Sequence, residues 1–359
     1  MACTRRTVVA GIGATASVAS SWPRLARAQA AARPVRLMLP WLPLGTYSSM
    51  FAAKKLGYWE KLGPDVTIDR GFGSTTVCVP VDQKQYDFGM LDMAVLAACI
   101  GRGLDLVAIG GLWPRSPIGI FSSADSGITH PKDLEGKEIG FVAGGGEFQL
   151  WPAFVKATGI DARKIKIINF DQATLMKAVA DRSVKIVGNY LGSIAPTMWA
   201  NDMRINSIFY EDYGVRMFSI CFAARRSTVA NDAELCRKFM TGAMQGLKYV
   251  YLNPEKAIDL HIESLKEFQD GNPRTRKTLV YGQAVATSLG LVESFKTGGL
   301  GYMDPKLVEE TRTSVETYMN IKGIPPAKQL YTNDFVGSVK LTDAEWSAVQ
   351  ECNKKELPI

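Results

Sequence analysis

Short apolar runs alternate with longer helical segments over the first two thirds of the chain. Runs that predict strands occupy residues 35–39, 66–68, 88–90, 106–109, 139–143, 165–168, 183–187 and 205–208. Segments that predict helices lie between them, at residues 48–56, 92–101, 152–158, 171–180 and 191–199. Alternation at this spacing is typical of βαβ units, so the pattern predicts an α/β fold built on mostly parallel sheets.

The pattern changes near residue 225, after which the chain is mainly helical. Helical segments follow at residues 232–251, 254–264, 277–289, 305–322 and 344–351. Two extended segments, at residues 118–122 and 217–223, read as crossings between two lobes. We expect the first lobe to contain residues 31–122 and 218–359, and the second to contain residues 123–217. Two crossings leave a cleft and permit hinge closure around a ligand.

The stretch from Ile139 to Trp151 is the strongest local candidate for a ligand-binding loop. An apolar run is followed by three glycines at residues 144–146, by Glu147, and by a segment that can be helical beyond Pro152. Backbone N–H groups in a turn between a strand and a helix start point at a ligand. An ordinary turn gives the same pattern, so the rest of the chain must decide between the two.

The first thirty residues have the features of an export signal. Arg5 and Arg6 precede a mildly apolar run at residues 8–20, and two small-x-small triplets end at Ala28 and Ala30. This arrangement predicts a secretory signal cleaved near one of those alanines. The arginine pair favours the twin-arginine route, although the valines after it match that signal weakly and leave the Sec route open. The apolar run is too short to span a membrane, so we expect a periplasmic protein.

Removing the signal changes the charge balance of the working protein. The segment holds four arginines and no acidic residue, which lowers the basic count from 42 to 38 against 35 acidic residues. This nearly balanced charge does not call for a nucleic-acid or membrane partner. We expect a monomer that binds a small molecule.

Cysteine and histidine usage argues against metal and cofactor chemistry. The five cysteines beyond the signal are scattered, odd in number and without a C-x-x-C pair, so they predict neither a metal site nor a disulfide framework. They are Cys78, Cys99, Cys221, Cys236 and Cys352. The two histidines, His130 and His261, stand apart in polar sequence surroundings. A histidine-based catalytic or zinc site is therefore not expected, and neither is a cofactor.

Four phrases carry a family resemblance. They are AAKKLGYWEKLG at residues 52–63, QYDFGM at 85–90, PKDLEGKEIG at 131–140 and NPEKA at 253–257. In this order they resemble the solute-binding proteins of ABC importers, in the group shared by aliphatic-sulfonate, taurine and thiamine-pyrimidine binders. The resemblance implies a bilobal type II periplasmic-binding fold. As partners it implies an ABC permease and its ATPase in the inner membrane. The last hundred residues match only in being helical.

The resemblance also implies a pocket between the lobes, built from loops at strand ends. Carried over by position, the candidate ligand-binding residues are Trp41, Tyr47, Ser74, Thr75, Thr76, Asp92, Gly145, Gly146, Glu147, Phe148, Asn189 and Tyr190. Aromatic rings offer flat apolar faces, while hydroxyl and amide groups orient a small ligand. Structural roles are open for the same residues, since Trp41 fits a core position and Ser74 and Asp92 fit helix caps.

Glu147 bears on the charge of the ligand. A carboxylate would repel a bound anion by about 4 kcal/mol at roughly 4 Å for an effective dielectric of about 20. A pocket with Glu147 and several aromatic rings instead favours a flat heterocycle with amino or ring N–H groups, and the resemblance to pyrimidine binders favours the same class. The alternative is an organic anion, a sulfonate or an aromatic carboxylate, which Arg115 beside Trp113 could clamp.

Two other functions remain as alternatives to transport. Fungal relatives on this fold make the thiamine pyrimidine and carry an iron-binding, cysteine-rich motif. This sequence contains no such cluster, and the export signal argues against a cytosolic synthase, so we expect no enzyme. A binding protein that serves a sensor would have the same sequence features as one that serves a transporter.

Overall fold

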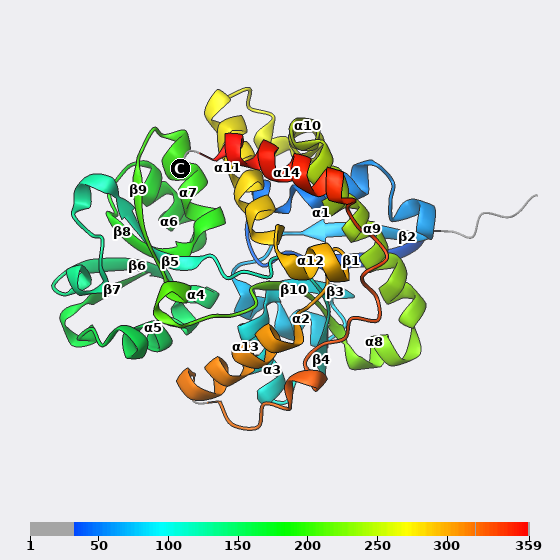
Figure 1. Cartoon of the computed structure of the whole chain (residues 1–359), viewed down its shortest axis with the longest axis horizontal. Helices are drawn as coiled ribbons and strands as arrows, with labels where there is room; N and C mark the ends of the chain where they lie inside the picture. The colour runs from blue at the N-terminus through cyan, green and yellow to red at the C-terminus, as the bar shows by residue number, and fades with distance from the viewer. Residues whose placement is uncertain (1–31, 320, 358–359) are drawn as a thin grey trace, which may run out of the picture. The chain divides into compact units, whose positions relative to one another are not determined.

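The computed structural model describes residues 32–319 and 321–357, which form two five-stranded sheets surrounded by helices (Figure 1). The predicted export signal lies outside the described residues. Within them, no helix is long and apolar enough to cross a membrane.

The first sheet is built from the N-terminal strands and one later strand. Its order is β2-β1-β3-β10-β4. The strands are β1 (Arg33–Met38), β2 (Pro64–Asp69), β3 (Phe88–Asp92), β4 (Leu106–Gly111) and β10 (Ile220–Arg225). β1 pairs in parallel with β2 and β3, whereas β10 runs antiparallel between β3 and β4.

The second sheet has the order β7-β6-β8-β5-β9. Its strands are β5 (Ile118–Ser123), β6 (Glu138–Val142), β7 (Lys166–Phe170), β8 (Ile186–Tyr190) and β9 (Ile205–Phe209). β6 pairs in parallel with β7 and β8, and β5 runs antiparallel to β8 and β9. Each sheet is therefore mixed. In each sheet the antiparallel strand is the first one after the chain crosses from the other sheet: β5 in the second sheet and β10 in the first.

Two details of the expected chain path are wrong. The sequence predicts that residues 118–122 leave the first lobe, but β5 pairs inside the second sheet, so the connection lies before it. β8 begins at Ile186 and not at residue 183, because the Asp181 carboxylate accepts from the Ser183 backbone and Arg182 takes a positive φ of 62° in a turn. β8 also continues beyond residue 187, because Asn189 and Tyr190 pair with Gly119 and Ile118 of β5, so these two residues end the strand and do not follow it.

Helices cover the faces of both sheets. Those near the first sheet are α1 (Ser48–Lys55), α2 (Cys78–Asp82) and α3 (Met93–Gly101). Those of the second are α4 (Gly146–Gln149), α5 (Trp151–Thr158), α6 (Gln172–Ala180) and α7 (Leu191–Ala200). α3 and α6 begin where Asp92 and Asp171 accept hydrogen bonds from the following backbone N–H groups, the usual satisfaction of a free helix start.

The C-terminal part of the described chain is helical, as its sequence predicts. It contains α8 (Arg226–Asn231), α9 (Ala233–Leu252), α10 (Pro254–Ser264), α11 (Pro273–Gly290), α12 (Glu293–Gly298), α13 (Pro305–Tyr318) and α14 (Asp343–Glu356). α8 and α12 are not expected from the sequence. Proline at the first turn of α10, α11 and α13 fits a position where the nitrogen needs no intrahelical partner.

Helix α11 contacts the second sheet's helix α7 as well as the helices around it. The rings of Tyr281 and Trp199 meet edge to face at 5.7 Å between centroids. Nearby, Lys277 and Asp202 form an exposed ion pair of 2.8 Å. The expectation that the C-terminal helices pack only on the first lobe is therefore incomplete, since α11 touches both lobes.

His261 lies in the core and not in the polar setting that its sequence neighbours indicate. Its ring is fully buried against Phe51 and Phe268, and its nitrogens contact the Ser48 hydroxyl and the Pro43 carbonyl. Burial lowers the pKa of His261 to about 4. It is a structural histidine of the first lobe.

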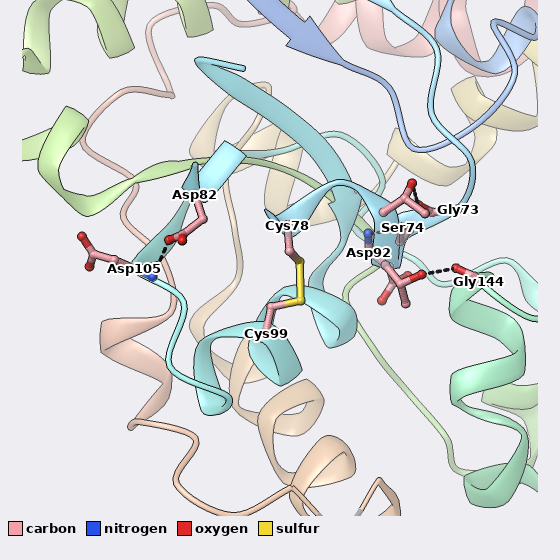
Figure 2. Close-up of a disulfide and its surroundings, with 10 residues drawn as sticks. Gly73, Ser74, Cys78, Asp82, Asp92, Cys99, Asp105 and Gly144 are labelled. Carbon is pink, nitrogen blue, oxygen red and sulfur yellow. Dashed lines mark hydrogen bonds between the residues drawn. A yellow bond between two sulfur atoms is a disulfide. The ribbon is translucent and has the colours of Figure 1, made fainter. Parts of the chain in front are cut away.

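A disulfide joins Cys78 on α2 to Cys99 on α3 (Figure 2). The expectation of no disulfide is wrong, because the pairing depends on two helices packing on the same side of the first sheet, with the two Cα atoms 6.6 Å apart. A separation of 21 residues in the chain does not reveal that approach. Among the described residues, Cys221, Cys236 and Cys352 are free thiols.

Candidate functional site

A cavity lies where the ends of strands from the two sheets meet. Its empty volume is about 340 Å³, including the part open to solvent. Its walls are formed by Pro40, Trp41, Tyr47, Gly73, Ser74, Trp113, Gly145, Gly146, Glu147, Asn189, Tyr190, Ser193 and Ile220. Most of these residues follow or end a parallel strand, which is where ligands bind in open α/β sheets.

The first lobe contributes aromatic rings to the cavity. Trp41 follows β1, and Tyr47 ends the short 3-10 helix η1 (Gly45–Tyr47). Trp113 follows β4, and its ring stacks on Tyr47 with 5.6 Å between centroids and 19° between planes. The three side chains are nearly completely buried, so they form a preformed apolar wall.

The glycine loop of the second lobe brings two polar groups close to its backbone. A Cβ atom at Gly145 would lie 2.1 Å from Oε1 of Glu147, and one at Gly146 would lie 2.2 Å from the Tyr190 hydroxyl. Any side chain at either position would displace these groups. The loop glycines therefore make room for functional side chains. The helix that starts here, α4, spans only Gly146–Gln149 and begins before the expected position.

The loops of the two lobes touch beside the cavity. The Thr75 hydroxyl donates to the Gly144 carbonyl at 2.9 Å, and Figure 2 shows Gly144 beside the loop that holds Gly73 and Ser74. Gly73 has a φ of 112°, and a Cβ there would lie 2.4 Å from the Gly144 oxygen. Glycine thus permits both the backbone conformation and the close approach.

Asp92 lies behind the cavity wall, at the end of β3. Its carboxylate accepts from the Ala94 backbone at 2.9 Å, and from the hydroxyls of Ser219 and Tyr190 at 3.2 Å each. Burial raises the pKa of Asp92 to about 6, while these hydrogen bonds act in the opposite direction. The bond from Tyr190 is a direct link between the two lobes.

Glu147 is the acidic group that lines the cavity itself. Only 2% of the residue is exposed, and its Oε1 has no hydrogen-bond partner. Burial raises the pKa of Glu147 to about 8, and the nearby charge of Asp92 adds to the shift. Backbone hydrogen bonds of Glu147 and Val142 act on this carboxyl group, but its Oε1 remains without a partner. Burying an unpaired carboxyl oxygen is costly, so Oε1 is a strong candidate for ligand contact.

Two unpaired donors share the cavity with Glu147. The indole nitrogen Nε1 of Trp41 and the amide nitrogen Nδ2 of Asn189 are buried and have no partner. The other end of the Asn189 amide accepts from the Tyr190 backbone at 2.8 Å, which orients the amide nitrogen. The cavity thus offers two N–H donors and one carboxyl group to a ligand.

Eight of the twelve candidate residues line the cavity. They are Trp41, Tyr47, Ser74, Gly145, Gly146, Glu147, Asn189 and Tyr190. Four do not. Thr75 bonds to Gly144, Thr76 donates to the Gly73 carbonyl, Asp92 caps α3, and Phe148 packs against Phe141 at 5.4 Å between centroids.

Five lining residues were absent from the sequence prediction: Pro40, Gly73, Trp113, Ser193 and Ile220. Trp113 follows β4 just as Trp41 follows β1, so the rule that selected Trp41 would have found it. Ser193 lies three residues after Tyr190, close to one helical turn in α7. Ile220 gave no local signal, because only the antiparallel pairing of β10 brings it to this edge.

None of the lining residues is a lysine, an arginine or a histidine. Arg115 does not line the cavity and pairs with Glu211 at 2.5 Å, with 57% of its side chain exposed. Arg225 donates to the backbone carbonyls of Val81 and Tyr86, and Arg226 donates to that of Gln329. Among the described residues, the cavity therefore has no cationic side chain to hold an anion.

The architecture is that of the periplasmic solute-binding proteins. The alkanesulfonate-binding protein SsuA from Xanthomonas axonopodis pv. citri, solved with bound MOPS, superposes with a TM-score of 0.63. The alignment covers 85% of this chain and 99% of that one at 14% identity. The bilobal fold expected from the sequence is thereby confirmed.

A family model described as NMT1/THI5 like matches residues 46–257, more than half of the chain. The chain belongs to the NMT1/THI5-like family, as the sequence phrases indicated. The riboflavin-binding protein RibY from Chloroflexus aurantiacus is 25% identical over 323 residues, 86% of this chain and 88% of that protein. The 4-amino-5-hydroxymethyl-2-methylpyrimidine phosphate synthase THI11 from Saccharomyces cerevisiae is 22% identical over 262 residues, 69% and 74% of the two chains. The relatives of this chain thus include a protein named for binding and one named as a synthase.

Proposed function

We propose that this protein is the extracytoplasmic solute-binding component of an ABC importer and captures one small, flat nitrogen heterocycle between its lobes. In this proposal residues 31–122 and 218–359 form the first lobe and residues 123–217 form the second, except that β5 also belongs to the second lobe. The partners are an inner-membrane permease and its ATPase.

One observation carries the proposal. Trp41 Nε1, Asn189 Nδ2 and Glu147 Oε1 are buried and have no hydrogen-bond partner, and all three residues line the same cavity. A heterocycle with two acceptor atoms and an amino or ring N–H group would satisfy all three, and it would lie among the rings of Tyr47 and Trp113. The relative RibY is named as a riboflavin-binding protein, and riboflavin is a flat, nitrogen-bearing ligand of this class.

The contacts between the lobes support capture by hinge closure. Tyr190 bonds to Asp92 and Thr75 bonds to Gly144, in each case across the cavity edge. Both bonds would have to break for the lobes to part at this edge, and each would re-form around a bound ligand.

The disulfide supports a location outside the cytoplasm. Disulfides persist in oxidising compartments such as the periplasm, and Cys78–Cys99 lies in the first lobe. This agrees with the export signal inferred from the first thirty residues and disfavours a cytosolic synthase. We infer that the protein binds its ligand without converting it.

The competing proposal is an organic anion held in the same cavity. It has less support, because the lining lacks a cationic side chain and contains the Glu147 carboxyl group. A sulfonate or an aromatic carboxylate would have to rely on neutral donors alone.

A thermal-shift screen of the purified mature protein tests the proposal. Pyrimidines, flavins, sulfonates and aromatic acids form the panel, and hits are titrated by calorimetry for stoichiometry. We expect one heterocycle per monomer, a higher melting temperature by linkage and no product by mass spectrometry. Binding confined to sulfonates or carboxylates would establish the competing proposal, and turnover of a heterocycle would establish an enzyme.

A further inference from the structure

We propose that the captured heterocycle is bound as a cation, protonated or alkylated at a ring nitrogen, and that the carboxylate of Glu147 is its counter-charge. The proposal rests on the proposed function and adds to it the charge state of the ligand. None of the relatives described above is named for a cationic ligand.

Two carboxyl groups are concentrated at one edge of the cavity. A Cβ at Gly146 would lie 2.2 Å from the Tyr190 hydroxyl and 3.6 Å from the Cβ of Asp92. Glu147 is the next residue, and its carboxyl oxygens lie beside Gly145. Asp92 and Glu147 are both completely or almost completely buried. Buried charges are normally paired, yet none of the described residues that line this cavity is basic.

The two carboxyl groups differ in how well they are satisfied. Asp92 has three donors, from Ala94, Ser219 and Tyr190. Glu147 Oε1 has none. A ligand could supply the partner that Glu147 Oε1 lacks, whereas Asp92 acts on the ligand only through Tyr190, as a positioning residue.

The aromatic walls suit the same charge. Trp41, Tyr47, Trp113 and Tyr190 all line the cavity. The negative face of an aromatic ring attracts a cation, and most strongly in a desolvated site. An anion would lose its hydration here and meet both the ring faces and a carboxyl group.

The unpaired donors restrict the cation to a heterocycle. Trp41 Nε1 and Asn189 Nδ2 need acceptor atoms, which a simple alkylammonium ion lacks. A ring with a positively charged N–H or amino edge and acceptor atoms elsewhere matches the whole set.

Binding of such a cation should be linked to proton release. Burial raises the pKa of Glu147 to about 8, so the free protein holds a proton there at neutral pH. Backbone hydrogen bonds of Glu147 and Val142 favour the ionised form of this carboxyl group. The titratable groups that interact with it are Asp92, Tyr190 and Tyr210, and Cys221 in turn lies near Asp92. None of them supplies a positive charge. A bound cation would favour the ionised form and displace the proton.

A pair of probes with one shape tests the charge by itself, because neither probe carries ring acceptor atoms for Trp41 Nε1 and Asn189 Nδ2. 4-Aminoquinoline is protonated on its ring nitrogen at neutral pH, whereas 1-naphthylamine has a C–H group at that position and is neutral. At about pH 7 we expect 4-aminoquinoline to bind at least about tenfold more tightly. Calorimetry in phosphate and in Tris, which differ in ionisation enthalpy, should report up to about one proton released with the cation and none with 1-naphthylamine.

Glu147→Gln removes the charge with little change of shape. We expect this variant to lose the preference for 4-aminoquinoline and to bind 1-naphthylamine within about twofold of the wild type. Glu138→Gln is the matched control, because Glu138 is exposed in β6 of the same lobe and pairs with Lys166. It should retain both the preference and the proton release.

Four outcomes would overturn the inference. Equal affinity for the two probes, or a preference that survives in Glu147→Gln, would show that charge is not recognised. Tight binding of a neutral flavin or uracil, with no preference for 4-aminoquinoline over 1-naphthylamine, would also show that charge is not recognised. It would leave the proposed function intact. If no ring compound binds the wild type, the proposed function fails, and this inference fails with it.

Discussion

Tyr190, at the end of β8, donates its hydroxyl to the carboxylate of Asp92, at the end of β3, over 3.2 Å. The two residues belong to different sheets and are separated by 98 positions in the chain. Tyr190 also lines the ligand cavity, whereas Asp92 lies behind it. The bond therefore connects lobe closure with the shape of the cavity wall.

Replacing Tyr190 with phenylalanine removes this bond and keeps the ring. A hydrogen bond to a charged partner contributes about 1.5–3 kcal/mol, part of which is exerted on closure. We expect the affinity for the best heterocycle of the screen to fall roughly tenfold, as measured by calorimetric titration.

The control for this variant is Tyr210→Phe. Tyr210 is also a buried tyrosine of the second lobe, but its hydroxyl bonds only to the Glu147 carbonyl, at 3.5 Å. The affinity of the Tyr210→Phe variant for the same heterocycle should be close to that of the wild type. Small-angle scattering of the ligand-free Tyr190→Phe variant should give a larger radius of gyration than the wild type, and an unchanged radius would argue against a closure role.

Local signals in the sequence account for most of the elements. Apolar runs followed by a cap, such as the end of β3 and Asp92 before α3, are visible because a strand and a helix start each leave a signature within a few residues. The expected start of β8 at residue 183 is wrong, because the turn at Arg182 and the bond to the Asp181 side chain override the β propensity there. The Cys78–Cys99 pairing depends on tertiary packing and leaves no local signal.

The residues of the candidate site could be predicted where they directly follow or end a strand that the sequence predicts. Glu147 follows β6 and Asn189 lies at the end of β8, so a rule about loops at strand ends finds them. Ile220 could not be found, because it enters through an antiparallel strand. Burial of Glu147 was also beyond the sequence, since it depends on tertiary packing, in part against Tyr210. That burial determines the charge properties of the cavity.

The folded protein should become less stable as the pH rises, because the proton that its buried Glu147 carboxyl group holds is then lost. Its pKa is raised from the ordinary 4.5 to about 8, so between these values the folded state keeps a proton that the unfolded chain has released. The stabilisation is complete below about pH 4.5 and is lost as the pH rises through 8. The shifts of Asp92, to about 6, and of His261, to about 4, act at lower pH.

Urea unfolding of the ligand-free protein at about pH 6.5 and 8 isolates this effect. A shift of one pKa unit corresponds to about 1.4 kcal/mol, so we expect a loss of about 2 kcal/mol across this interval. Glu147→Gln should lose little stability over the same range, whereas the exposed control Glu138→Gln should follow the wild type. A wild-type profile as flat as that of Glu147→Gln would mean that the carboxyl group is ionised in the folded protein.

The disulfide should contribute to stability through the unfolded state. Closing a loop of 21 residues between Cys78 and Cys99 restricts the unfolded chain, which corresponds to about 3 kcal/mol for a loop of this length. We expect the double variant Cys78→Ala, Cys99→Ala to lose roughly that amount in urea unfolding. Cys352→Ala, which removes a free and partly exposed thiol, is the control. Equal stability of the double variant and the wild type would contradict the prediction.

Gly73 should be required for the lobes to approach each other. Alanine there would adopt a φ of 112°, which is unfavourable for a residue with a side chain, and would place its Cβ 2.4 Å from the Gly144 oxygen. Backbone strain alone destabilises the fold by about 1 kcal/mol or more. The clash adds a second effect, because the Gly144 loop belongs to the other lobe and must move away, which interrupts the bond from Thr75.

Gly127→Ala separates these two effects. Gly127 has a φ of 73°, and a Cβ added there would have nothing within 4 Å, so alanine introduces strain without a clash. Both variants should lose stability in urea unfolding. Only Gly73→Ala should also lose about tenfold or more in affinity for the best heterocycle of the screen, because the closed cavity no longer forms. If Gly127→Ala weakens binding as much as Gly73→Ala does, strain transmitted through the fold and not contact between the loops controls closure.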